Sequence, residues 1–543
     1  SFLQEPTMFG TITLAALALN CLSASVDAFL FPQPSLPPHT GNEPVKYSGN
    51  GETADYWRAV AKTELRNALA TQTNIGIAKN VILFLGDGMS IPTVTASRIL
   101  KGQLQNKTGE EGHLSFDLFP HTGLSKTYCQ DHQTPDSAAT GTAYLSGIKT
   151  NMGTIGVDGR TRFGDCYSSK GAEVTSILDW SLAAGKSVGI VTTTRVTHAT
   201  PAAAYAHVAN RDWEGDHYTS GIPGGCKDIA AQLIDDNPNI QVIMGGGRQF
   251  FLRYDQRDPE HGSNAHYGRR DGRDLIQKWM DDKHTRGKNY KYVWNATDFH
   301  AVDPSSTDYL LGLFEYSHMN YDYERKDPNH EVAGEPSLEE MTEKAIQILS
   351  KNKKGFFLLV EGGLIDHGHH EGRAFLALYD TLAFDKAIAK GDSITNRNDT
   401  LIVVTADHSH TMNIAGYPSR GNDILGKVDD GHGGYSRGSD GLPYTTLLYL
   451  DGPGYDVHSG HRGNITRVNT DDKHYHQQAA VPLSSETHGG DDVAIFARGP
   501  MSHLFTGVHE QNYIPHLMAY ASCVGDYSLQ SECAAAEVAK HHP

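Results

Sequence analysis

The sequence predicts an α/β protein with a large central, mostly parallel β-sheet that is flanked by helices on both faces. Two observations support this prediction: short apolar runs recur along the 543 residues, and helical patterns lie between them. The runs are continuously apolar, as is typical of parallel strands that are covered on both faces. They read NVILFLGDGM, KSVGIVTTT, IQVIMGGG, GFFLLVEGG, DTLIVVTADHSH and DVAIFARGP.

The beginning of the chain predicts a processing signal followed by a flexible arm. Met8 precedes the apolar stretch ITLAALALNCLSA and the small residues of SVDAF, so residues 1–28 are interpreted as a signal peptide with upstream residues. An ordinary hydrophobic helix is the alternative. Residues 29–52 are rich in Pro, Gly and Ser and predict a flexible segment. Four glycosylation sequons agree with secretion, namely Asn106, Asn295, Asn398 and Asn464.

Three segments predict helices, one before the first apolar run and two between later runs, and one region predicts an insertion. A helix follows Thr53, which is a suitable N-cap, over TADYWRAVAKTELRNALA. The patterns GAEVTSILDWSLAAG and EEMTEKAIQILSKN are also helical. Residues 416–486 are crowded with Gly, Asp and His, which indicates an insertion with little regular core.

The charge of the chain excludes some partners. With 46 basic and 64 acidic residues the net charge is −18, and we expect no specific binding of nucleic acid. An acidic protein that acts on an anion needs a local source of positive charge, and metal ions supply it. Twenty-nine histidines make metal binding worth testing.

Metal-binding side chains follow several predicted strands. Ligands of open α/β sheets gather beyond the carboxyl ends of the strands, so this position is informative. A single histidine is more often an ordinary hydrogen-bonding residue, but repetition behind separate strands favours metal sites. Mixed His and Asp ligands suit zinc, whereas Asp, Glu and a hydroxyl suit magnesium. The candidates are Asp87, His198, Thr200, Glu361, Asp366, His367, His370, Asp407, His408 and His410, with His488 before the last strand.

A serine lies where a helix is expected to begin. In PDSAATGTAYLSG, the small residues after Asp136 predict a helix with Ser137 at its N-terminus, where backbone N–H groups favour an anion such as phosphate. A serine hydroxyl becomes a good nucleophile only when a base or metal ion activates it. Taken alone, Asp136 and Ser137 are more simply a capping pair.

Together these motifs closely resemble those of animal alkaline phosphatases. The matching motifs are FLGDGM, PDSAATGTAYLSG, TTTRVTHATPAAAYAHVANR, VEGGLIDHGHH, TADHSH and ETHGGDD, in family order. The resemblance runs from about residue 53 to 533 and implies one catalytic domain, within which residues 416–486 form the crown insertion, followed by a tail over 534–543. It implies hydrolysis of phosphate monoesters at alkaline pH through a phosphoserine, which releases an alcohol and inorganic phosphate.

The resemblance also implies a role for each site residue. Ser137 is the expected nucleophile, and Arg211 is expected to hold the phosphate. Two Zn²⁺ and one Mg²⁺ are expected, with His198, His367 and His410 as supporting residues around them. The implied ligands are Asp366, His370 and His488 for one zinc, Asp87, Asp407, His408 and Ser137 for the other, and Asp87, Thr200 and Glu361 for magnesium.

Further features follow from the resemblance alone. It implies one Ca²⁺ held by Glu260, the Phe314 carbonyl, Glu315 and Glu335, and it implies disulfides Cys166–Cys226 and Cys523–Cys533, with Cys129 left as a free thiol. A homodimer that is secreted or held at the cell surface is expected. Family members commonly carry a glycolipid anchor, but the end of this sequence, ECAAAEVAKHHP, shows no apolar tail.

Two other functions remain open at this point. A related phosphodiesterase or sulfatase shares the sheet and a metal site, but the former usually has a Thr nucleophile and two zincs, and the latter a Cys or Ser in a different context. Ser137 followed by AATG, with Thr200 and Glu361 for a third ion, favours a monoesterase. The second alternative is not an enzyme: it is a secreted protein that binds metal ions but has no catalytic activity.

Overall fold

The computed structural model describes residues 51–262, 267–326, 334–458, 460, 462–530 and 533. The predicted signal peptide, almost all of the segment 29–52 and the tail 534–543 lie outside the described residues. Everything described belongs to a single unit, Gly41–Pro543. Among the residues that the structure describes, no helix is both long enough and apolar enough to cross a bilayer.

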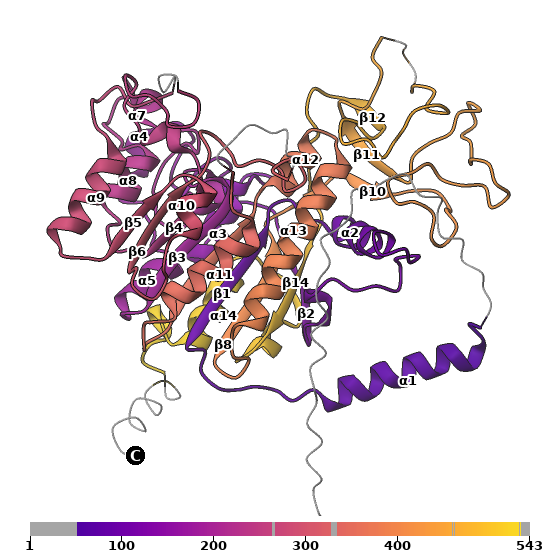
Figure 1. Ribbon diagram of the computed structural model, residues 1–543, viewed down its shortest axis with the longest axis horizontal. Coiled ribbons are helices and arrows are strands. Elements are labelled where there is room, and N and C mark those ends of the chain that lie inside the picture. The colour runs from indigo at the N-terminus through magenta and orange to yellow at the C-terminus, as the bar shows by residue number, and fades with distance from the viewer. Residues whose placement is uncertain are drawn as a thin grey trace, which may run out of the picture. The chain divides into compact units, whose positions relative to one another are not determined.

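A ten-stranded sheet forms the centre of the fold (Figure 1). Its order is β15-β2-β14-β8-β1-β7-β3-β4-β6-β5. All six apolar runs of the sequence are strands of this sheet, which confirms the predicted α/β class. The strands are β1 (Asn80–Gly86), β2 (His121–Lys126), β3 (Ser187–Arg195), β4 (Val242–Gly246), β5 (Tyr290–Val293), β6 (Tyr309–Leu313), β7 (Phe356–Gly362), β8 (Thr400–Ala406), β14 (Val493–Arg498) and β15 (Gly507–Glu510).

Strand β1 lies between β7 and β8, and both pairings are parallel. The pairing is in register, with Phe84 opposite Val360 and Val404. Strand β14 is the exception to the parallel pattern, because it runs antiparallel to both β8 and β2. Its N-terminal end therefore lies at the same edge of the sheet as the carboxyl ends of β1, β7 and β8.

Helices cover both faces of the sheet, as predicted (Figure 1). On one face α11 packs against α13, which also contacts α2 and α12, while α3, α5 and α14 pack together on the other. Successive side chains of β1 pack against the two helix layers in turn. Leu83 belongs to the core beneath α14, whereas the Phe84 ring contacts Phe384 of α13. These helices are α2 (Ile91–Gln103), α3 (Ser137–Ser146), α5 (Ile177–Ala183), α11 (Leu338–Leu349), α12 (Leu364–His370), α13 (Ala374–Ser393) and α14 (Tyr513–Ser522).

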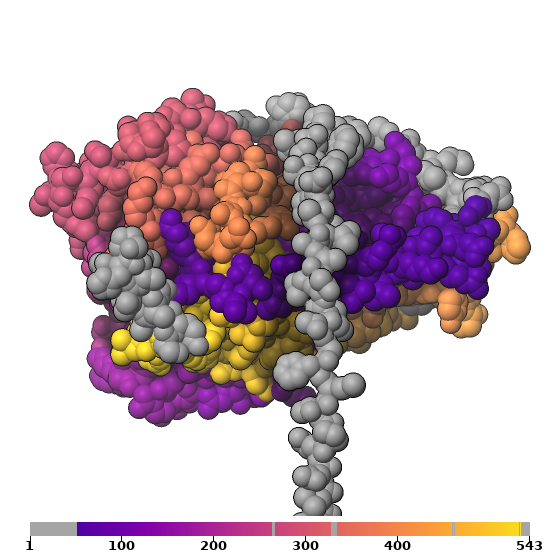
Figure 2. Space-filling model, turned by 90° about the horizontal axis from the view of Figure 1, so that it is seen from below, coloured from indigo at the N-terminus to yellow at the C-terminus, as the bar shows by residue number. Residues whose placement is uncertain are grey.

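Helix α1 (Ala54–Ala70) begins after Thr53, whose hydroxyl accepts a hydrogen bond from the Tyr56 N–H, as the sequence predicts. It has no buried residue, and the indigo band in Figure 2 shows the start of the described chain at the surface. The other α-helices are α4 (Cys166–Ser169), α6 (Ala199–Ala202), α7 (Asp216–Thr219), α8 (Ile229–Asp235), α9 (Leu275–Thr285) and α10 (Ala296–His300). Short 3-10 turns are η1 (Phe116–Leu118), η2 (Arg248–Phe250), η3 (Ser502–Phe505) and η4 (Gly525–Tyr527).

The region 416–486 contains little regular structure, in keeping with its composition. A small sheet of β10 (Met412–Ile414), β11 (Leu447–Gly452) and β12 (Ala479–Pro482) lies at its base. Isolated bridges such as Lys427 to Thr445 organise the loops, and Ile424, Leu425 and Val428 are buried. A separate pair of short strands, β9 (Ser409–His410) and β13 (His488–Gly489), connects this region to the central sheet, between the end of β8 and the beginning of β14.

The cysteines pair as the family resemblance implies. Cys166 is bonded to Cys226 and Cys523 to Cys533. Cys129 is a free, buried thiol. Burial raises the pKa of this thiol to about 11, so that it is protonated at neutral pH.

Candidate phosphate and metal site

The predicted site residues meet at one edge of the sheet because parallel strands end there together. Asp87 follows β1, Glu361 is the penultimate residue of β7, and Asp407 and His408 follow β8. His488 reaches the same edge from the other direction, since it precedes the antiparallel strand β14 and pairs with His410 through β13 and β9. The topology thus explains why residues far apart in sequence form one cluster.

Ser137 is the first residue of α3, where Asp136 is the N-cap and accepts a hydrogen bond from the Ala139 N–H. The Ser137 Oγ lies 3.3 Å from an Asp87 carboxylate oxygen and 3.2 Å from Nε2 of His408. A helix N-terminus favours a bound anion, and the serine hydroxyl points from it toward acceptor groups. The capping prediction and the predicted position of the nucleophile are therefore compatible.

In the first predicted zinc set, His370 and His488 point the lone pairs of their Nε2 atoms toward the same place. Nδ1 of His370 lies 2.5 Å from the Glu486 carbonyl oxygen, and Nδ1 of His488 lies 2.8 Å from the Pro135 carbonyl oxygen. A carbonyl only accepts, so both Nδ1 atoms carry the proton and both Nε2 atoms are acceptors. These Nε2 atoms are 3.0 Å apart and lie 3.5 and 3.4 Å from Asp366.

The second predicted set shows the same pattern. Nδ1 of His408 faces the Ser409 carbonyl, which leaves Nε2 as an acceptor. Nε2 nevertheless lies 3.1 Å from the Asp407 carboxylate and 3.4 Å from that of Asp87. Burial, together with the charges of Asp407 and Asp366, raises the pKa of Asp87 well above its usual value. In both sets, then, ring nitrogens and carboxylate oxygens with free lone pairs lie close together. A divalent cation fits such a ligand set.

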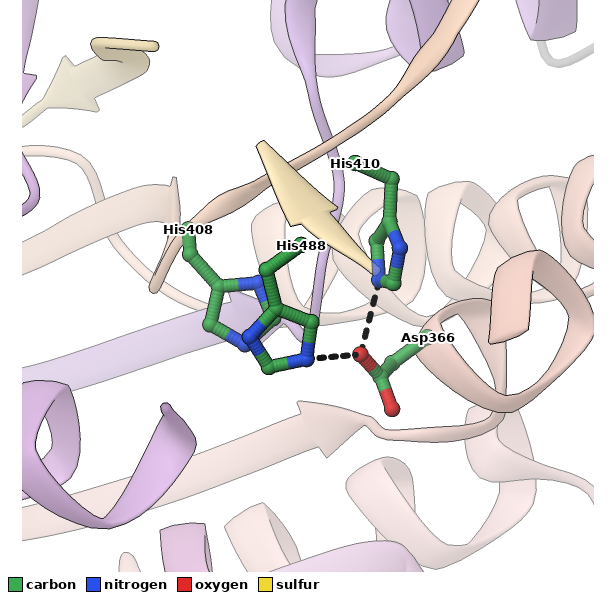
Figure 3. Close-up of side chains that lie close together, drawn as sticks. All are labelled: Asp366, His408, His410 and His488. Atoms are coloured by element: carbon green, nitrogen blue, oxygen red, sulfur yellow. Dashed lines mark hydrogen bonds and ion pairs between the residues drawn. The ribbon is translucent and has the colours of Figure 1, made fainter. Parts of the chain in front are cut away.

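Figure 3 shows Asp366 beside His410 and His488, with the His408 ring stacked on that of His488. Nε2 of His410 lies 2.7 Å from Asp366, and its Nδ1 lies 2.6 Å from a Glu486 carboxylate oxygen. Burial alone lowers the pKa of His410, but the two carboxylates outweigh it and raise the pKa to about 10. His410 is therefore a cation that orients Asp366, as expected of a supporting residue rather than a ligand.

The predicted magnesium ligands also lie together. Glu361 is fully buried, and burial raises its pKa to about 7 although the Thr192 and Thr200 hydroxyls act in the opposite direction. Its Oε2 accepts hydrogen bonds from Thr192 and Thr194, whereas its Oε1 is buried without a hydrogen bond. An orphaned carboxylate oxygen beside Thr200 and Asp87 matches an oxygen-ligated Mg²⁺.

Arg211 faces the site from the loop after α6. One guanidinium nitrogen donates to Asp136 over 3.0 Å, and the other lies 3.1 Å from Nε2 of His198. Asp136 therefore does more than the sequence suggested, because it caps the Ser137 helix and also orients the arginine. Glu486 was likewise not singled out from the sequence, although it stands within the ETHGGDD motif.

The four residues of the predicted calcium site form a separate acidic cluster. Burial, followed by the neighbouring Glu315, raises the pKa of both Glu260 and Glu335. The Asn320 side chain bridges Glu315 and Glu335, and Arg248 pairs with Glu260 over 2.7 Å. Three buried carboxylates with a nearby Phe314 backbone suit a hard cation such as Ca²⁺.

Among the sequons, Asn106, Asn398 and Asn464 are exposed, whereas Asn295 is buried and caps α10 through the Asp298 N–H.

Comparison with known proteins identifies the family. The alkaline phosphatase family model matches residues 78–524. The chain belongs to the alkaline phosphatase family. It is 54% identical to the tissue-nonspecific alkaline phosphatase of Rattus norvegicus over 478 residues, which is 87% of this chain and 88% of the rat protein. It is 52% identical over 475 residues to the alkaline phosphatase of Gadus morhua, covering 87% and 97% of the two chains.

Solved structures agree on the fold. The alkaline phosphatase of Thermus thermophilus has a TM-score of 0.60 at 23% identity, over 88% of this chain and 99% of that one. That of the Antarctic bacterium TAB5 has a TM-score of 0.57 at 23% identity, over 83% and 100%. As an alkaline phosphatase, the protein is a metal-dependent hydrolase of phosphate monoesters.

Proposed function

We propose that this alkaline phosphatase transfers the phosphoryl group of a monoester to Ser137 and then to water, at alkaline pH. The observation that supports this most directly is the Ser137 hydroxyl at the N-terminus of α3, which lies 3.3 Å from Asp87 and 3.2 Å from His408. The products would be an alcohol and inorganic phosphate.

Two Zn²⁺ ions and one Mg²⁺ fit the donor sets described above. Asp366, His370 and His488 would hold one zinc, and Asp87, Asp407 and His408 with Ser137 the other. Asp87, Thr200 and Glu361 would hold the magnesium. Bound metal ions of this kind lower the pKa of a hydroxyl or of water and stabilise the attacking and leaving oxygens of an in-line displacement.

The chain's own residues position the phosphate. The Arg211 guanidinium, held by Asp136, would bind two phosphate oxygens through its planar fork, and the backbone N–H groups of α3 would face a third. Ser137 Oγ would attack phosphorus opposite the leaving oxygen, so that the bond from Ser137 to phosphorus forms as the bond to the alcohol oxygen breaks. The Ser137 proton would pass to solvent, and the departing alkoxide would take up a proton and leave as the alcohol. Water enters from the face that the alcohol has left, and the Ser137 oxygen departs with its proton restored.

Three further assignments are proposals of the same kind. Glu260, Glu315, Glu335 and the Phe314 carbonyl would bind one Ca²⁺. The protein is proposed to be secreted or to act at the cell surface, in keeping with its two disulfides. A homodimer is proposed, with the region 416–486 at the interface.

Substrate class is tested by comparing an aryl phosphate monoester, the matching diester and the matching sulfate ester, with zinc and magnesium present. We expect the monoester to be hydrolysed fastest at alkaline pH, and a chelator to abolish the activity. A preference for the diester or the sulfate would contradict the proposal, and chelator-resistant activity would contradict the metal assignment.

A further inference from the structure

A cavity of about 700 Å³ lies between the edge strand β15 and helix α14. Sites that bind small molecules typically measure ~300–1,000 Å³. The residues that line this cavity include neither the proposed nucleophile nor Arg211 nor any of the predicted metal ligands. Helix α14 contributes Tyr513, His516, Leu517 and Tyr520 to the lining. The cavity is therefore separate from the phosphate and metal site.

Aromatic rings form much of the cavity wall. The His509 ring stacks on that of Tyr513 with the centroids 4.4 Å apart, and Tyr527 meets Tyr520 edge to face at 6.0 Å. Leu504 and Val508, which are both exposed, add aliphatic surface. Such walls favour a planar apolar ring, which can lie against tyrosine faces and edges.

The polar end of the cavity carries more positive than negative charge. Lys126 lines the cavity and pairs with Glu510 over 2.6 Å, while Lys149 pairs with the same carboxylate over 3.0 Å. Two ammonium groups thus share one carboxylate. Glu510 is the main cause of the raised pKa of Lys126, and the next carboxylate, Asp492, contributes less. A negatively charged group on a ligand is therefore favoured at this end.

We propose that this cavity binds a small aromatic anion, such as an aryl sulfonate or an aryl carboxylate, and that the bound molecule slows the reaction at Ser137. The ring of the ligand would lie against Tyr513 and Tyr520, with its anionic group beside Lys126. This is a binding site beyond the substrate site, and its effect on the reaction is an allosteric one.

Hydrogen bonds link the cavity to the helix that carries Ser137. Nε2 of His516 lies 3.1 Å from the Gly147 carbonyl oxygen, and its Nδ1 lies 3.1 Å from the Tyr527 hydroxyl. A carbonyl only accepts, so Nε2 carries the proton and Nδ1 accepts from Tyr527. The Asn512 side chain donates to the same carbonyl over 3.1 Å. Gly147 is the C-cap of α3, so two residues of the cavity hold the end of the nucleophile helix.

Helix α3 is suited to transmit a displacement because it is packed on every side. All of its 10 residues are buried, and a helix of this length spans about 15 Å. A second link is Gln511, which lies between two lining residues and donates to the Asp407 carbonyl over 2.7 Å. Misplacement of a reacting group by ~1 Å can lower a rate by about 10²-fold. A ligand that moves His516 should therefore lower kcat.

Binding is tested with 8-anilinonaphthalene-1-sulfonate, an aromatic anion whose fluorescence rises in apolar surroundings. The full-length protein, loaded with zinc and magnesium, is titrated with this probe while saturating inorganic phosphate occupies the active site. We expect one probe per chain, and we expect Leu504→Glu to raise its Kd at least ~10-fold, because like charges then meet in the cavity. Leu118→Glu is the matched control, since Leu118 is also an exposed leucine of a 3-10 turn. Absence of binding, or equal affinity in the three proteins, would overturn the proposal.

Steady-state kinetics test the link to Ser137. With a phosphate monoester as substrate, the probe should lower kcat and leave KM unchanged in the unaltered protein and in Leu118→Glu, but have little effect on Leu504→Glu. A rise in KM alone, or bound probe with unchanged kcat, would overturn the allosteric link. Binding that appears only after deletion of residues 534–543 would assign the cavity to the chain's own tail and would also overturn the proposal. The titration does not depend on turnover, so its outcome stands apart from the Ser137 mechanism.

Discussion

Removal of the divalent ions should make the stability of the protein depend on the ionisation of Glu361. Burial raises the pKa of this residue from 4.5 to about 7. Between these values the folded state binds more protons than the unfolded state, so this residue's contribution to the free energy of unfolding falls as pH rises. A pKa difference of about 2.5 corresponds to a loss of about 3 kcal/mol once the group is ionised.

Thermal unfolding of the chelated protein at pH 5 and pH 8 measures this effect, with Glu361→Gln as the comparison. At ~2.1 cal/mol/K per residue the unfolding entropy of a chain this long is about 1 kcal/mol/K, so ~3 kcal/mol corresponds to a Tm change of about 3 °C. Buried histidines add a pH dependence of opposite sign, but it is common to both proteins. The Tm of the original protein should fall by about 3 °C more than that of Glu361→Gln. Identical pH dependence in the two chelated proteins would refute the reasoning.

Three other predictions follow from single contacts. Arg211→Lys should lower kcat/KM for a phosphate monoester by about 10²-fold, since it loses the planar fork; unchanged steady-state kinetics would count against the assigned role. Arg248→Met should lower the free energy of unfolding by about 3–5 kcal/mol, because the buried Asp258 and Glu260 lose their partner; a chemical denaturation curve that matches that of the unaltered protein would contradict this. Cys129 should react with a thiol reagent at pH 8 far more slowly in the folded than in the denatured protein, because burial raises its pKa to about 11; equal rates would be inconsistent with a buried thiol.

The sheet centre and the metal-binding edge could be predicted because their signals are local. Each of β1, β3, β4, β7, β8 and β14 is a continuous apolar run, and the residue type that follows each run is visible in the sequence. The antiparallel direction of β14 could not be read locally, since it depends on pairing with β2 and β8.

Other elements lacked a clear periodic signal. Strand β2 is only half buried, and its buried positions are Gly123 and Ser125 instead of large apolar residues. Helix α13 is buried around most of its circumference. The roles of Asp136 and Glu486 arise from tertiary contacts with distant residues, namely Arg211 for Asp136 and His410 for Glu486. A sequence pattern does not specify such contacts, whereas the family motifs predicted a nucleophile and zinc ligands at residues that do come together.

The central claim is that Ser137 carries the phosphoryl group, and trapping the intermediate tests it most directly. The full-length enzyme, loaded with zinc and magnesium, is mixed with a phosphate monoester, quenched with acid and digested, and its peptides are analysed by mass spectrometry. We predict one phosphoryl group on Ser137, and neither label nor appreciable turnover in Ser137→Ala. A phosphoryl group on another residue, or full activity in Ser137→Ala, would contradict the mechanism.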